Sequence, residues 1–263
     1  MKKTTAQGQR ATISRLAAII LCAMALFTAS PGASRAGGVC PGDPDMGTMR
    51  LPHLHTAISV GTEGLIVALG SSSTAGAMAS DSSHSYPAVL QAALTKALPY
   101  AHFAVINRGI GGQDAPEEVM RLETDVLAVR PQLVIWQVGA NGAMRHADPA
   151  EFHRMVEDGV DRLVKAGIDV ILMDNQRTPR VLAAAEHGVL EDSLRDVARE
   201  TGVNLFSRSH LMDAWSDAGA KPALFTASDG LHQNDLGYLC VSQTLARQIV
   251  AAISGPLAIS ASR

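Results

Sequence analysis

Apolar runs alternate with helical patterns along the chain from residue 64 onward. Five runs lack alternating polarity, as expected of strands that are buried on both faces of a sheet. They cover residues 65–69, 103–106, 133–138, 170–173 and 203–206. A strand followed each time by a helical pattern predicts parallel strands rather than hairpins.

Five helices are predicted from apolar residues at helical spacing. They cover residues 86–98, 119–129, 148–167, 189–201 and 236–253. In the third of these, Asp148 and Pro149 match an N-cap and a first-turn proline, and Glu151 matches the glutamate of a capping box. The alternation predicts a three-layer α/β/α sandwich around a doubly wound, five-stranded parallel sheet.

The N-terminal segment has the pattern of a secretory signal peptide. Residues 1–36 contain five basic residues and no acidic ones, and an apolar run at 16–27 is too short to span a bilayer. We expect cleavage after Ala36, with an uncleaved anchor as the alternative. Residues 37–63 then form a lead-in, and residues 64–263 form one domain.

Cleavage would leave 17 of the 22 Lys and Arg residues against 25 Asp and Glu, a net charge of about −8. So acidic a chain is not expected to bind nucleic acid. Once the signal is removed, we expect no stable association with a membrane. We expect the mature protein in the periplasm or outside the cell. There, Cys40 and Cys240 would remain after the loss of Cys22, and we predict a disulfide between them.

No motif indicates a metal or a cofactor. His53 and His55 lie without a third ligand nearby in the sequence, so we interpret them as surface residues. The glycines after the first two strands have neither the lysine of a P-loop nor the spacing of a dinucleotide-binding fingerprint.

Small and polar residues follow the predicted strands, and these strand ends meet at one edge of a parallel sheet. The candidate nucleophile is Ser72, in the turn after the first strand, with Ser71 and Ser73 as lesser candidates. Asp229 and His232, three residues apart before the last helix, could supply an orienting acid and a base. The segments after the second and third strands, Asn107 to Gln113 and Gly139 to Gly142, could supply donors for an oxyanion.

This constellation resembles the SGNH (GDSL-type) hydrolase family, in order, from about residue 64 to the C-terminus. The resemblance implies that Ser72, Asp229 and His232 form a catalytic triad. It also implies that the oxyanion is bound by the amide of Ser72, the amide of Gly112 and the side chain of Asn141. Gly112 is chosen over Gly109 and Gly111 because the glycine of the family usually stands five residues after the asparagine that ends the second strand, which here is Asn107.

Two supporting carboxylates of the family pattern are missing. The Gly-Asp-Ser-Leu block has Ser71 in place of its aspartate, and the Gly-x-Asn-Asp block has Gly142 in place of its aspartate. In the family these carboxylates support loops and do not react, so the sequence still predicts a serine esterase that acts through an acyl-enzyme on a small or carbohydrate ester. An O-acyltransferase using the same site and a carbohydrate-binding pseudoenzyme remain as alternatives.

Overall fold

The computed structural model describes residues 40–255, and the predicted signal peptide lies outside them. Five parallel strands form one sheet in the order β2-β1-β3-β4-β5. Their bounds are β1 Gly64–Gly70, β2 Phe103–Gly109, β3 Leu133–Gln137, β4 Asp169–Met173 and β5 Asn204–Phe206. The predicted doubly wound α/β/α sandwich is therefore confirmed.

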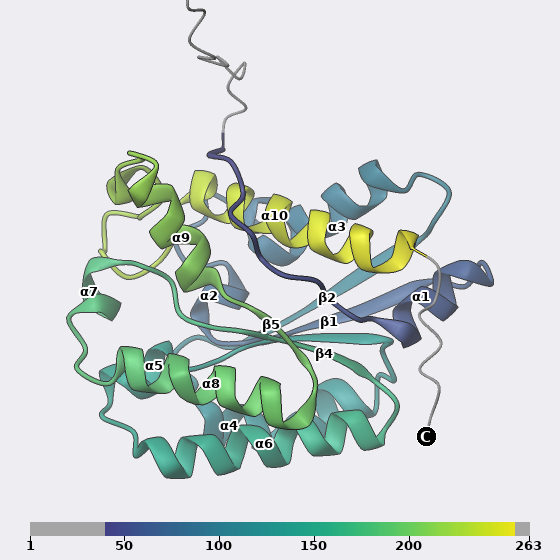
Figure 1. Cartoon of the computed structure of the whole chain (residues 1–263), viewed down its shortest axis with the longest axis horizontal. Helices are drawn as coiled ribbons and strands as arrows, with labels where there is room; N and C mark the ends of the chain where they lie inside the picture. Colours follow the sequence, from purple (N-terminus) through teal and green to yellow (C-terminus); the bar gives the residue numbers. More distant parts are fainter. Residues whose placement is uncertain (1–39, 256–263) are drawn as a thin grey trace, which may run out of the picture. The chain divides into compact units, whose positions relative to one another are not determined.

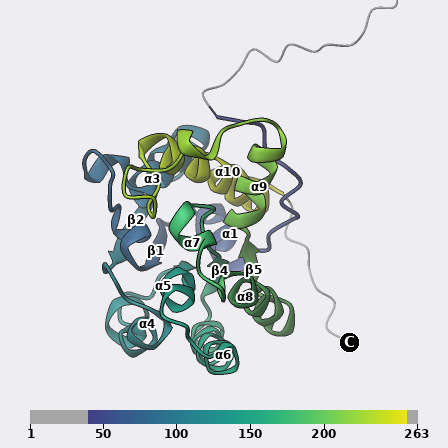
Figure 2. The ribbon, with the colours of Figure 1, turned by 90° about the vertical axis from the view of Figure 1, so that its left-hand side faces the viewer.

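Helices cover both faces of the sheet, as Figures 1 and 2 show. Side chains alternate between the two faces along each strand. In β1, Ile66 and Ala68 belong to one core, and Val67 and Leu69 belong to the other. The first core also contains residues of α1 Pro52–Ser59, α3 Tyr86–Ala97, α9 Arg208–Asp217 and α10 Asp235–Ser254, and the second those of α6 Pro149–Lys165 and α8 His187–Thr201.

Shorter helical segments lie in the loops between these layers. They are α2 Ser72–Ala75, α4 Ala115–Met120, α5 Ala140–Met144, α7 Pro179–Leu182, the 3₁₀ turns η1 Ser82–His84 and η3 Pro222–Leu224, and the π-helical turn η2 Glu123–Leu127. The helix predicted over residues 119–129 is thus divided into α4 and η2. Helix α6 begins as predicted at the N-cap Asp148, whose side chain accepts a hydrogen bond from the Glu151 amide. Within the described residues the Glu151 side chain does not return the bond, so the predicted capping box is only half formed.

The lead-in is more firmly packed than its composition indicated. Leu51 and Leu54 are fully buried in the first core, and the Asp169 carboxylate accepts a hydrogen bond from the Leu54 amide at 2.9 Å. The predicted disulfide joins Cys40 to Cys240 in α10. Helix α10 is long and apolar enough to span a membrane, but more than half of it is buried inside the fold, as in a core helix.

Glu118, on α4, has a fully buried carboxyl group. Its Oε2 accepts a hydrogen bond from Trp136 Nε1 at 2.8 Å, while Oε1 has no partner within the described residues. Burial raises the pKa of Glu118 to about 8, against the opposing effects of the Trp136 hydrogen bond and the charge of Arg121. The folded protein therefore keeps a proton at neutral pH that the unfolded chain releases.

We predict that Glu118 makes the fold less stable as pH rises. Below about pH 4.5 both states hold the proton, and from there to about pH 8 only the folded state does, so the unfolded state gains in relative stability. Relative to Glu118→Gln, the wild type should lose on the order of 3–4 kcal/mol of unfolding free energy between pH 5 and 8. Urea unfolding at both pH values measures this, and a pH-independent difference would contradict it.

Candidate active site

The site lies at the carboxyl ends of the strands, next to the point where the strand order reverses. Because β1 lies between β2 and β3, the chain leaves β1 and β3 toward opposite faces and opens a crevice there. The turn after β1 carries Ser72, and the segment after β3 carries Asn141.

Three hydrogen bonds on one acceptor shape the turn that holds Ser72. Gln137 Oε1, at the end of β3, accepts from the Ser71 amide, the Ser71 hydroxyl and the Thr74 hydroxyl at 3.1–3.2 Å. Gly70 is required here, because a Cβ on it would lie 2.3 Å from Thr74 Oγ1 and its φ is +156°. Ser71 and Ser73 are buried, whereas Ser72 is partly exposed at the first position of α2.

The structure brings Ser72, His232 and Asp229 into one hydrogen-bonded chain. His232 Nε2 lies 2.7 Å from Ser72 Oγ, and His232 Nδ1 lies 2.6 Å from Asp229 Oδ2. A carboxylate can only accept, so Nδ1 carries the ring proton in neutral imidazole and Nε2 accepts from the Ser72 hydroxyl. This is the arrangement that raises the nucleophilicity of a serine.

Asp229 is held ionised. Its Oδ1 accepts from the amides of Leu231 and His232, each at 3.0 Å. Partial desolvation acts to raise the pKa of Asp229, but the hydrogen bonds from the His232 amide, the His232 ring and the Leu231 amide outweigh it and lower that pKa to about 2. The carboxylate can therefore orient the ring and balance its positive charge at any pH well above 2.

Side chains from the loop after β4 hold the segment of residues 229–232 through its backbone. The carbonyl of Leu231 accepts from Gln176 Nε2 at 2.8 Å and from Thr178 Oγ1 at 3.0 Å. Gln176 Oε1 in turn accepts from Arg208 Nη2 at 2.7 Å, and Arg208 is almost completely buried. No local sequence pattern marks Gln176, Thr178 or Arg208 as part of the site.

The candidate oxyanion donors lie on two further loops. The loop of Gly111 and Gly112 passes beside Ser72, since a Cβ on Gly111 would lie 3.9 Å from Ser72 Cβ. Gly112 is exposed, and its amide has no hydrogen-bond partner within residues 40–255. Asn141 Nδ2 donates one hydrogen bond to the Gln113 carbonyl at 2.6 Å, which leaves its second N–H.

Two arginines hold these loops together. Arg121 donates to the carbonyls of Gly70 and Arg108 and to Gln113 Oε1 at 2.6–2.9 Å. Arg145 donates to the Gly112 carbonyl at 2.5 Å. The loops after β1, β2 and β3 are thus joined by guanidinium groups, a link for which the sequence pattern gave no signal.

Residues from other positions stand close to where the two missing carboxylates would be. Gln137 fixes the turn beside Ser71, and the Asp114 carboxylate faces Gly142. A Cβ on Gly142 would lie only 3.0 and 3.1 Å from the two Asp114 oxygens. Asp114 also caps α4 through the Ala115 amide at 2.7 Å, and burial raises the pKa of Asp114. Its carboxylate and the side chain of an aspartate at 142 would therefore compete for one space.

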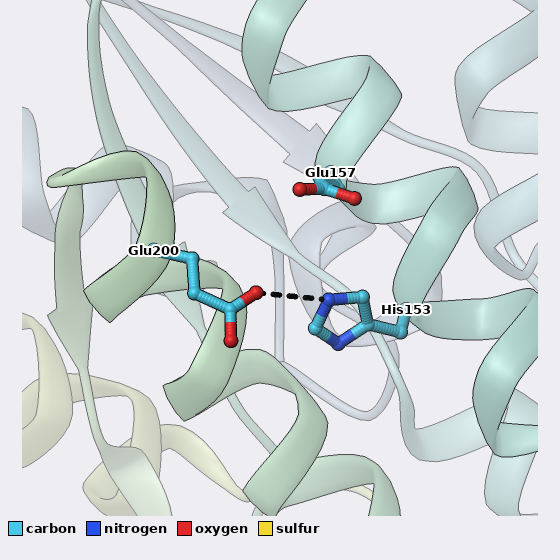
Figure 3. Close-up of side chains that lie close together, drawn as sticks. All are labelled: His153, Glu157 and Glu200. Atoms are coloured by element: carbon cyan, nitrogen blue, oxygen red, sulfur yellow. Dashed lines mark ion pairs between the residues drawn. The ribbon is translucent and has the colours of Figure 1, made fainter.

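A separate cluster of three titratable side chains lies between α6 and α8 (Figure 3). Atoms of His153, Glu157 and Glu200 that could bind a metal lie within 4.8 Å of one another. His153 Nε2 forms an ion pair with Glu200 at 3.3 Å, and Nδ1 lies 3.3 Å from Ser193 Oγ. Both ring nitrogens thus have partners, and we interpret the group as a link between the two helices.

The chain belongs to the Non-GDSL lipase-like family, whose model matches residues 39–255. This places it among lipase-like hydrolases and confirms the resemblance predicted from the sequence. No curated protein sequence matches significantly.

Solved structures of similar fold include esterases. One is a two-domain esterase active on acetylated mannans, with 24% identity and a TM-score of 0.66 over 79% of this chain and 55% of that one. A lipase/acylhydrolase from Enterococcus faecalis has 23% identity and a TM-score of 0.60, covering 71% and 95%. The acetyl xylan esterase AlAXEase has 21% identity and a TM-score of 0.58, covering 72% and 99%. The chain spans just over half the length of the two-domain esterase.

We predict that an aspartate introduced at position 142 can replace the carboxylate of Asp114. Asp114→Ala should lower kcat for 4-nitrophenyl acetate about tenfold, because the segment after β3 loses its support. Gly142→Asp should lower kcat in the wild type, where two carboxylates would collide, but should raise it in Asp114→Ala. Steady-state kinetics on the four proteins measures this, with thermal unfolding as the control. Additive losses in the double variant would contradict the exchange.

Proposed function

We propose that the protein is a secreted or periplasmic serine esterase. Ser72 is the nucleophile, His232 the general base and Asp229 the group that orients the base. The observation that carries the proposal is the 2.7 Å approach of His232 Nε2 to Ser72 Oγ, with Asp229 Oδ2 2.6 Å behind the ring. The disulfide between Cys40 and Cys240 supports an oxidising compartment.

In the first half-reaction, Ser72 Oγ attacks the ester carbonyl carbon while its proton passes to His232 Nε2. The carbonyl oxygen becomes an oxyanion, and the amides of Ser72 and Gly112 and the side chain of Asn141 donate to it. Each such donor can contribute about 10²–10³ in rate. The intermediate collapses, the bond to the alcohol oxygen breaks, and the imidazolium gives its proton to the departing alcohol.

In the second half-reaction, water attacks the acyl-enzyme. His232 accepts a proton from the water and then returns one to Ser72 Oγ, which releases the carboxylic acid and restores the enzyme. If a carbohydrate hydroxyl took the place of water, the same groups would catalyse acyl transfer. No cofactor or metal is required by this sequence of steps.

Acetylated carbohydrates are the first substrates to test. Two structures of similar fold are described as an esterase active on acetylated mannans and as an acetyl xylan esterase. A carbohydrate-binding pseudoenzyme was suggested by the two missing carboxylates. Because Gln137 accepts a hydrogen bond from Ser71 and the Asp114 carboxylate lies against Gly142 and accepts from its amide, we favour the esterase over the pseudoenzyme.

We predict that Ser72→Ala lowers kcat for 4-nitrophenyl acetate by at least about a thousandfold, since loss of a triad nucleophile leaves only residual catalysis. Ser73→Ala is the matched control, because Ser73 is buried in the same helix, and it is Ser72 whose hydroxyl lies within hydrogen-bond distance of His232. It should keep most of the activity. Near-wild-type rates in Ser72→Ala, with the loss in Ser73→Ala instead, would overturn the assignment.

A further inference from the structure

A pocket of about 360 Å³ lies beside the proposed active site. Its walls come from α5 and α7, which are in contact and lie side by side in Figures 1 and 2. Helix α5 carries Asn141. Helix α7 follows the loop whose Thr178 holds the carbonyl of Leu231. The pocket is therefore formed by the helix that carries the candidate oxyanion donor and by the helix that follows a support of the Asp229 to His232 segment, although neither Asn141 nor that segment lines it.

Arg180 joins the pocket to that segment. Its backbone amide donates to the Gly230 carbonyl at 3.0 Å, and its Cγ would lie 3.9 Å from a Cβ on Gly230. The base of the arginine is thus fixed against the residue next to Asp229. Arg180 is exposed and lines the pocket, and within the described residues its side chain forms neither an ion pair nor a hydrogen bond.

The other carboxylate and imidazole groups near the pocket have partners of their own. His146 lies on the opposite wall, and its Nδ1 is 2.9 Å from Glu186 Oε2. Its Nε2 has no hydrogen-bond partner within the described residues. Asp229 is bonded to His232. The rest of the wall is uncharged and consists of Ala143, Met144, Ala183 and Ala184.

An exposed guanidinium beside small apolar side chains is suited to bind a carboxylate, because its planar N–H groups match the two oxygens. The apolar wall would pack against the ring that carries the carboxylate. Pockets of this size hold small-molecule groups.

We propose that this pocket binds the alcohol part of the substrate through a carboxylate group, as in an acylated sugar acid, and that Arg180 determines this specificity. The proposal rests on the esterase function argued above. The guanidinium binds and orients the anionic alcohol while Ser72 attacks the acyl group.

The test compares two matched esters, the methyl glycosides of O-acetyl glucuronic acid and of O-acetyl glucose acetylated at the same hydroxyl. The wild type should show a kcat/KM about tenfold higher for the glucuronate ester, and added salt should reduce the preference. Arg180→Gln should remove the preference, and Arg180→Lys should retain part of it. Arg154→Gln, an exposed arginine on α6, is the control and should leave the ratio unchanged.

Inhibition gives a second readout that needs no turnover of the sugar esters. Unacetylated methyl glucuronoside should inhibit 4-nitrophenyl acetate hydrolysis more strongly than methyl glucoside, and Arg180→Gln should abolish the difference. Equal kcat/KM for both esters, or equal inhibition by both glycosides, would overturn the carboxylate subsite while 4-nitrophenyl acetate is still hydrolysed. Absence of hydrolysis of all three esters would instead contradict the esterase function.

Discussion

The hydrogen bond between Ser72 Oγ and His232 Nε2 joins two segments that lie 160 residues apart in the sequence. Each segment must be fixed before the two side chains can stay within 2.7 Å, because two free loops would lose this geometry to conformational entropy. The fold meets this constraint with a parallel sheet that brings the strand ends together. Buried polar side chains then hold each loop to its neighbour.

Those polar side chains act as two braces. On the serine side, Gln137 and Arg121 tie the turn after β1 to β3 and to the loop after β2. On the histidine side, Arg208 and Gln176 hold the carbonyl of Leu231. Gln137, Gln176 and Arg208 are all almost fully buried, where an unpaired polar group would be costly and a paired one is firmly placed. The site is therefore built from interactions whose loss would cost stability as well as geometry.

The sheet, Ser72, Asp229 and His232 could be predicted because their signals are local in the sequence. Apolar runs mark the strands, and small or polar residues mark the strand ends. The braces could not be predicted in this way: Arg121 and Arg208 look like surface residues, and their partners depend on the folded topology. Helix α9 was also missed, although Leu211, Met212 and Trp215 show helical spacing, and α1 was obscured by the Gly and Pro content of the lead-in.

The most direct test of this account is the identity of the residue that a fluorophosphonate modifies in the native protein. Such a reagent forms a stable bond only with a serine that is activated by a base and faces an oxyanion site. Peptide mass mapping should place one adduct on Ser72, and His232→Ala should prevent its formation. An adduct on Ser71, on Ser73 or on a serine elsewhere, or no adduct on the folded wild type, would contradict the account.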